Sequence, residues 1–300
     1  MLLSLLLFAC GGDIGIRTVD KIQTNDTGFE VVDTAVSQPS SEPSWEPSSE
    51  PSGEPSSETG GPDEPIEEGG TTADGWLIGG TTLITAAYPD DSIFDNGGNC
   101  EVNLTGSTTK GPCYFQDSTG EDISEGFKGL PMLLCLRLID SNCEPLANHT
   151  VEVWHCDANG VYSGGRSESA DAANFNPGFC TGDDAEALSS SWYRGQLVTD
   201  ANGRVNFKSC FPGWYPSRTI HVHFAVSDAN GSSRIVSQFG FSDDIATQVY
   251  TTHPFYSHRG DQDTPLDQDG IFPADKEPFV MTTQQNADGS ILAYHTIQVS

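Results

Sequence analysis

The chain has 300 residues and a formal net charge of −30, because 43 acidic residues stand against 13 basic ones. Nucleic-acid binding needs lysine and arginine to displace counterions from phosphates, so this charge excludes that class of function. The same charge provides no long-range attraction for an anionic substrate.

The first ten residues, MLLSLLLFAC, form an apolar run that ends at Cys10. The run is too short to span a bilayer and is typical of a secretory signal. Small residues before Cys10 resemble a bacterial lipoprotein cleavage site, although no Lys or Arg precedes the run. We expect residues 1–10 to be a lipoprotein-type signal peptide, and the protein to be exported, lipid-anchored at Cys10, in the cell envelope of a bacterium or outside the cell. The alternative is a fragment of a buried helix.

Residues 11–74 include the Glu-Pro-Ser repeat SSEPSWEPSSEPSGEPSSE. Proline and like charges keep such a segment extended and unpacked, so we expect a disordered N-terminal tether. Residues 75–300 are enough for one domain with a full core.

Turn signals divide this domain at short intervals. The sequence DANG occurs at 157–160, 200–203 and 228–231, and NADG occurs at 286–289. Such Asn-Gly and Asp-Gly pairs favour tight turns. The predicted strands cover 130–140, 150–156, 161–165, 195–199, 204–210, 220–227, 234–241 and 290–300, whereas 184–192 and 243–253 allow short helical turns at most. The pattern predicts an all-β fold, a β-sandwich of mostly antiparallel strands.

Seven cysteines follow Cys10, and none of them forms a CxxC pair. The spacing argues against a zinc ribbon, and an exported chain with this many cysteines is expected to carry disulfides. An odd count leaves at least one thiol unpaired, and the connectivity cannot be read from sequence. The seven are Cys100, Cys113, Cys135, Cys143, Cys156, Cys180 and Cys210.

The segment PSRTIHVHF at 216–224 sets two histidines one residue apart. Because alternate side chains of a strand share a face, His221 and His223 point one way, and Val222, Phe224 and Val226 point toward the core. The two imidazoles can bind a metal or can be polar residues on a solvated face.

Two tyrosines could complete a metal site with this pair. Tyr215 precedes His221 by six residues, and Tyr162 follows the first DANG turn. A phenolate is a hard anionic ligand that suits ferric iron better than zinc or copper. The alternative is that both are amphipathic residues at the rim of the core.

Several motifs in order resemble the intradiol ring-cleavage dioxygenases, the family of protocatechuate 3,4-dioxygenase and catechol 1,2-dioxygenase. They are GPCYF at 111–115, the stretch 122–163 that ends in WHCDANGVYS, YRGQLVTDANGRVNF at 193–207, PGWYPSRTIHVHF at 212–224, SQFGF at 237–241 and HPFYSHRGDQDT at 253–264. The resemblance implies one non-haem Fe(III) ion bound by Tyr162, Tyr215, His221 and His223. It implies O2-dependent cleavage of a catechol-type ring between its two hydroxylated carbons, with no organic cofactor, and an oligomer is possible.

The resemblance also implies roles around the iron. Tyr215 and Arg218 would be catalytic, with Tyr215 as a base and Arg218 over the substrate ring. Tyr114 and Gln238 would bind substrate. Each has a structural alternative: a surface ion pair for Arg218, a strand residue for Gln238 and a packed aromatic for Tyr114.

Two other classes of function fit parts of the sequence. One is a non-catalytic extracytoplasmic β-sandwich binding module on a lipoprotein, which would need neither tyrosine nor the histidine pair. The other is a cupin-like metalloenzyme, which needs a carboxylate soon after the histidine pair, where the sequence offers only Asp228 in a turn.

Overall fold

The computed structural model describes residues 66–95, 105–117 and 120–300, all within one compact unit, Gly60–Ser300. The expectations for residues 1–65, including the signal peptide, lipidated Cys10 and most of the tether, lie outside these ranges. Order begins before residue 75, since the Gly69 amide donates to the Ile78 carbonyl at 2.8 Å. In the ranges that the structure describes, no helix is long and apolar enough to cross a membrane.

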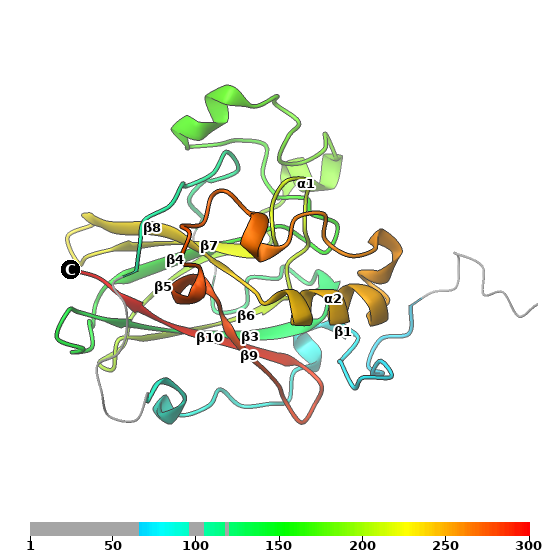
Figure 1. Ribbon diagram of the computed structural model, residues 1–300, viewed down its shortest axis with the longest axis horizontal. Coiled ribbons are helices and arrows are strands. Elements are labelled where there is room, and N and C mark those ends of the chain that lie inside the picture. The colour runs from blue at the N-terminus through cyan, green and yellow to red at the C-terminus, as the bar shows by residue number, and fades with distance from the viewer. Residues whose placement is uncertain (1–65, 96–104, 118–119) are drawn as a thin grey trace, which may run out of the picture. The chain divides into compact units, whose positions relative to one another are not determined.

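Two four-stranded sheets lie face to face and form a β-sandwich (Figure 1). One sheet has the order β6 (Arg204–Cys210), β3 (Pro131–Ile139), β10 (Ile291–Gln298) and β9 (Thr282–Gln285). The other has the order β5 (Arg194–Val198), β4 (Thr150–Trp154), β7 (His221–Ser227) and β8 (Ser233–Gly240). A small pair joins β1 (Gly79–Gly80) to β2 (Lys128–Gly129). Only β3 and β10 pair in parallel among these strands, so the mostly antiparallel sandwich predicted from the sequence is confirmed.

The main core lies between the two sheets, and β7 shows how the sequence builds it. Val222, Phe224 and Val226 point into this core, as their alternation predicts. The opposite face of β7, with both histidines, is also buried, because loops cover it. His221 and His223 are therefore buried next to the main core.

Two predicted elements differ from the structure. Residues 161–165 form no strand, because the Tyr162 amide donates to the carbonyl of Cys180 in a distant loop. Residues 243–252 form more than a turn: α2 (Asp243–Thr252) is capped by Ser242 and buries Ala246, Val249 and Tyr250 on one face. The other helical segments are α1 (Ala185–Ser189) and the 3-10 turns Thr81–Leu83, Asp91–Phe94, Ala170–Asn174, Ser257–Arg259, Leu266–Gln268 and Glu277–Phe279.

The three DANG sequences fold in the same way. In each turn the Asp carboxylate accepts the amide of the residue two positions on and that of the residue four positions on; the acceptors are Asp157, Asp200 and Asp228. The repeat is therefore shared turn chemistry, as the sequence predicts, and each turn ends in a glycine with positive φ.

Candidate metal centre and its cleft

His221 and His223 lie next to each other on the covered face of β7. Their Nε2 atoms are 3.2 Å apart. The Nδ1 of His221 lies 2.6 Å from the Thr219 carbonyl, which fixes the proton on Nδ1 and leaves Nε2 as an acceptor. The ring of His223 stacks on Trp154 at 5.0 Å, with the planes 9° apart. Both rings are thus held in place before any ligand binds.

The first DANG turn brings the two tyrosines toward these histidines. The Gly213 amide donates to the Asp157 carbonyl at 2.9 Å, which joins this turn to the segment before Tyr215. The backbones are so close that a Cβ added to Gly160 would lie 2.2 Å from the Trp214 carbonyl oxygen. A glycine is therefore required at position 160, and Tyr162 and Tyr215 reach one site.

Four donor atoms converge at this site. The Oη atoms of Tyr162 and Tyr215 lie 3.4 Å and 3.1 Å from the Nε2 of His221. Ligands that each lie about 2.1 Å from one ion are separated by about 3.0–3.4 Å at octahedral to tetrahedral angles. Among the described residues no three His, Cys, Asp or Glu side chains gather to bind a metal, so a metal held here would need the two tyrosine oxygens beside the two imidazoles.

Burial sets the protonation of all four side chains. It holds the pKa of Tyr162 well above its ordinary value and raises the pKa of Tyr215 to about 12, against the effect of Arg218. It also lowers the pKa of His221 and His223 well below the usual value. The imidazoles are therefore neutral ligands at pH 7, and a highly charged cation would favour the two phenolates. Two hard oxygens with two imidazoles fit ferric iron.

Arg218 connects this donor set to the rest of the domain. Its Nε donates to the Asp269 carboxylate at 2.8 Å, and its Nη1 lies 3.4 Å from the Tyr215 Oη. Its Nη2 donates to the Gln238 side chain, whose own amide donates to the Thr109 carbonyl at 3.0 Å. Gln238 lies opposite His223 in the β7–β8 pair and is fully buried behind Arg218. Asp269, which the sequence analysis did not single out, is the residue that orients Arg218.

Tyr114 is connected to the histidine pair through Trp154, which stacks on His223. Its hydroxyl donates to Glu152 at 3.0 Å, and its ring packs against Trp154 at 4.8 Å. It is not among the residues that line the cleft beside Tyr215. Its contribution to substrate binding stays a prediction. What the structure shows is that its ring packs on Trp154, which in turn stacks on His223.

A cleft of about 460 Å³ opens beside the donor set. Tyr215 and Arg218 line it together with residues that the sequence analysis did not single out, because nothing local marks them: Thr109, Gly111, Pro112, Asp171, Asn174, Phe175, Phe179, Pro216, Ser217 and Ile271. Small-molecule sites have volumes in this range. A pocket of ligand size thus reaches the donor set at Tyr215.

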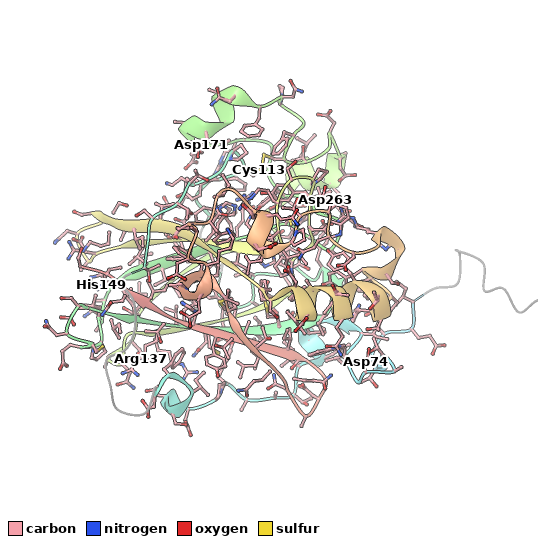
Figure 2. All side chains as sticks on the ribbon, viewed as in Figure 1. Asp74, Cys113, Arg137, His149, Asp171 and Asp263 are labelled. Carbon is pink, nitrogen blue, oxygen red and sulfur yellow. A yellow bond between two sulfur atoms is a disulfide. The ribbon has the colours of Figure 1, made fainter. Side chains whose placement is uncertain are left out.

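Two carboxylates and one disulfide hold the cleft walls. Asp171 accepts the Gly111 amide at 2.9 Å, and Asp263 accepts the Ser217 amide at 3.2 Å; both carboxylates are labelled in Figure 2. A disulfide joins Cys113 to Cys180. A Cβ added to Gly111 would lie 2.9 Å from the His223 ring, so the segment with Cys113 packs directly on a donor. In the described part of the chain, the free thiols are those of Cys135, Cys156 and Cys210, all buried.

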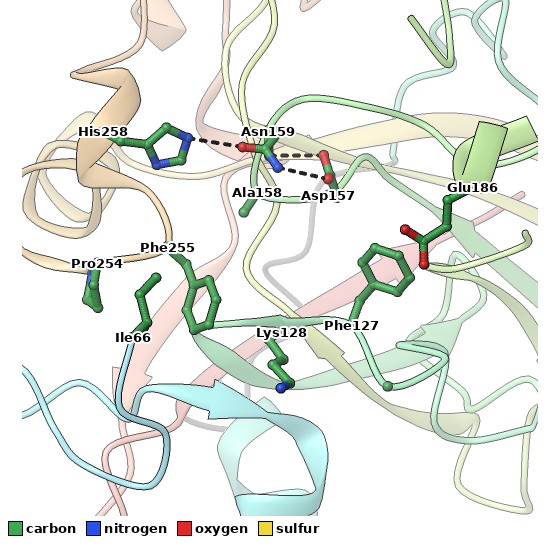
Figure 3. Close-up of a pocket in the computed structure, with 11 residues that line it drawn as sticks. Ile66, Phe127, Lys128, Asp157, Ala158, Asn159, Glu186, Pro254, Phe255 and His258 are labelled. Atoms are coloured by element: carbon green, nitrogen blue, oxygen red, sulfur yellow. Dashed lines mark hydrogen bonds between the residues drawn. The ribbon is translucent and has the colours of Figure 1, made fainter. Parts of the chain in front are cut away.

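A second cavity, of about 410 Å³, lies on the far side of the first DANG turn. Figure 3 shows the His258 ring facing Asn159, with Nε2 and Oδ1 3.1 Å apart, and Asn159 facing Asp157. These polar groups satisfy one another, and none of the four donor residues lines this cavity. This cavity is therefore separate from the donor set.

Comparisons with known proteins cover the segment that contains this site. Residues 108–253 match a family model described as "Dioxygenase". The chain is 26% identical to a catechol 1,2-dioxygenase of Acinetobacter baylyi over 48% of this chain and 49% of the relative. It is 31% identical to the protocatechuate 3,4-dioxygenase beta chain of Burkholderia cepacia over 36% of this chain and 43% of the relative. The chain thus spans about half the length, or less, of these curated relatives.

A solved structure matches a larger share of the chain. The intradiol ring-cleavage dioxygenase from Tetranychus urticae superposes with a TM-score of 0.56 at 25% identity, over 66% of this chain and 95% of that one. The matched region contains both tyrosines, both histidines and Arg218 in the motif order described above. The domain that includes residues 108–253 belongs to the intradiol ring-cleavage dioxygenase family.

Proposed function

We propose that the domain is a non-haem Fe(III) dioxygenase that cleaves catechol-type rings between the two hydroxylated carbons, with O2 as the oxidant. The observation that carries the proposal is the convergence of Tyr162, Tyr215, His221 and His223 at a cleft that Tyr215 itself lines. The relatives named as dioxygenases of catechol and protocatechuate support it.

The overall reaction balances without another reductant. One molecule of catechol and one molecule of O2 give one molecule of cis,cis-muconic acid, with no atom left over. The bond between the two hydroxylated carbons breaks, and each of these carbons gains one oxygen atom and becomes a carboxyl carbon. The four electrons that reduce O2 come from the ring, so the protein needs only to bind, orient and deprotonate the substrate.

The residues of the cleft can supply these steps. Ferric iron held by the four donor side chains would withdraw electron density from a bound catechol and so make its ring reactive toward O2. Tyr215 lines the cleft, and its oxygen, once bound iron had made it a phenolate, could accept a catechol proton. The Arg218 guanidinium, 3.4 Å from that oxygen, would stabilise negative charge that develops on the ring. Asp269 and Gln238 hold the guanidinium in this position.

Metal analysis of the purified protein, together with its visible absorption spectrum, tests the proposal. We expect one iron per chain and a burgundy to red colour from tyrosinate-to-iron charge transfer. Product analysis with catechol under air should give muconate. A colourless protein that takes up zinc in place of ferric iron, or a yellow semialdehyde product, would contradict the assignment. No turnover across a broad catechol panel would favour a non-catalytic binding module.

We also propose that the protein is exported and anchored to a membrane through an acylated Cys10. The support is the sequence MLLSLLLFAC followed by the Glu-Pro-Ser segment. Cys10→Ala should release the protein from the membrane fraction, and globomycin should block its processing. A Cys10→Ala protein that still fractionates with membranes would overturn the anchor.

A further inference from the structure

We infer that the preferred substrate of this cleft is a catechol that carries an uncharged aryl substituent, bound with its second ring on Phe179 and Phe175. The inference rests on the proposed function for the position of the catechol ring, beside Tyr215. The size of the cleft, its aromatic wall and its charges each point to this class of substrate.

The cleft is too large for one ring. Its volume is about 460 Å³. An apolar cavity of about 150 Å³ is enough to hold benzene. A single catechol beside Tyr215 would therefore leave most of the cleft to water, whereas a two-ring ligand would fill much more of it.

The unfilled part of the cleft has an aromatic wall. The Phe179 ring lies 6.3 Å from the Tyr215 ring and 4.5 Å from the Phe175 ring, so three rings follow one another outward from the donor set. Phe175 and Phe179 are 43% and 45% exposed, and Ile271, which also lines the cleft, is 37% exposed. Large apolar side chains left open in a cleft indicate a binding surface. A second aromatic ring is the group that stacks best on this wall.

The charges of the cleft disfavour an anionic substituent. Among the residues that line it, Arg218 is the one cation and Asp171 the one carboxylate. The guanidinium of Arg218 already contacts Asp269, Tyr215 and Gln238. A carboxylate on the substrate would therefore meet Asp171 without a free cation to compensate for it. An uncharged substituent avoids this cost.

The aromatic wall is fixed in place before substrate binds. It lies between Asp171, whose carboxylate accepts the Gly111 amide, and Cys180, which is bonded to Cys113. The Cys180 carbonyl also accepts the Tyr162 amide at 2.8 Å. A wall held at both ends can select a second ring without first ordering a loop.

Equilibrium dialysis of the full chain, metal-free and iron-loaded, under anaerobic conditions with 4-phenylcatechol, catechol and 3,4-dihydroxybenzoate tests the inference. In both forms we expect 4-phenylcatechol to have a dissociation constant at least tenfold below that of catechol, and 3,4-dihydroxybenzoate to bind most weakly. Phe179→Ala should reduce the preference for 4-phenylcatechol over catechol by roughly threefold to tenfold. Phe179→Tyr keeps the ring and should retain the preference. Val198→Ala, at an exposed apolar residue outside the cleft, should bind all three ligands as the parent does.

The outcomes separate this inference from the proposed function. Equal dissociation constants for catechol and 4-phenylcatechol, or a preference for 3,4-dihydroxybenzoate, would overturn the inference even if the iron-loaded chain cleaves catechol. A preference for 4-phenylcatechol that disappears in Phe179→Ala would support it even if no catechol is cleaved. Mass analysis after alkylation would verify that each variant keeps the disulfide beside position 179.

Discussion

Tyr162 and Tyr215 offer the same donor atom in different surroundings. Tyr162 is 2% exposed and lies behind the cleft, whereas Tyr215 lines the cleft and has Arg218 beside its hydroxyl. We therefore expect Tyr215→Phe to keep iron and bind catechol, but to lower kcat by roughly 10²–10⁴-fold because a proton acceptor is lost. Tyr162→Phe should shift the visible spectrum of both the resting protein and its catechol complex.

Titration of catechol into each iron-loaded variant, with spectra recorded at each step, compares the two tyrosines. An unchanged catechol-complex spectrum in Tyr162→Phe, with a changed one in Tyr215→Phe, would show that the two roles are reversed. His221→Ala and His223→Ala should lose iron outright, because each removes a donor fixed by β7. His258→Ala is the matched control, since His258 faces Asn159 in the second cavity and should keep iron.

Asp269 is the buried partner of a buried cation. Its side chain is fully buried, that of Arg218 is 14% exposed, and their closest atoms are 2.8 Å apart. Asp269→Asn should lower the free energy of unfolding by about 3 kcal/mol, because it leaves the guanidinium without a counter-charge. Urea unfolding measures this change. Asp263→Asn, at an exposed carboxylate that also holds the cleft, should lower the free energy of unfolding by less than about 1 kcal/mol. If the two variants lose the same free energy of unfolding, the buried ion pair is not important for stability.

At the level of elements, the sequence predicts β7 well because its signal is local. Alternation places Val222, Phe224 and Val226 in the core and both histidines on the other face, and the structure confirms this. The spacing of a strand alone brings His221 and His223 together. By contrast, the position of Tyr162 and Tyr215 beside the histidines is predicted only by the resemblance to the family. Their approach depends on a distant contact, between the first DANG turn and Gly213.

Long-range contacts explain what the sequence did not predict. Tyr162 lies in irregular backbone because its amide bonds to Cys180, a residue that no pattern around Tyr162 indicates. The ion pair between Arg218 and Asp269 crosses 51 positions of the chain. Contacts between distant segments therefore place Tyr162 and Arg218. The helix α2 is a different case, because its signals are local: Ser242 caps it and one face is buried, but the apolar spacing is too short to distinguish a helix from a turn.

The disulfide between Cys113 and Cys180 spans 67 positions and joins the segment that packs on His223 to the aromatic wall. Replacing both cysteines by serine should lower the free energy of unfolding by about 2–4 kcal/mol, because the unfolded chain loses a cross-link. Iron should remain bound, since no donor is changed. Urea unfolding and metal analysis would measure the two effects, and loss of iron with unchanged stability would contradict this division.

At the scale of the whole molecule, three histidines outside the donor set contribute to the dependence of stability on pH. Burial lowers the pKa of His155, His253 and His295 to about 4. In the unfolded chain their pKa is about 6.5, so the unfolded state takes up protons first as the pH falls. The stabilisation is complete above pH 6.5 and is lost between pH 6.5 and about 4. Each histidine should cost about 2 kcal/mol by pH 5.

Urea unfolding of the metal-free protein at pH 7.5 and pH 5.0 measures this dependence. His253→Gln is the informative variant, because its amide can still donate to the Leu77 carbonyl that His253 Nε2 contacts. The difference in unfolding free energy between the two pH values should be about 2 kcal/mol smaller in this variant. An unchanged difference would show that His253 does not remain neutral in the folded protein.

The parallel pairing of β10 with β3 determines at which stage of synthesis the first sheet can finish folding. Met132 of β3 pairs with Ile291 of β10, and β10 lies inside its sheet, between β3 and β9. When residues 1–290 have been synthesised, the chain contains the donor set and all residues of the cleft, but β3 still lacks its parallel partner β10. The sandwich therefore closes after synthesis has passed the site, through contacts between distant segments that form slowly.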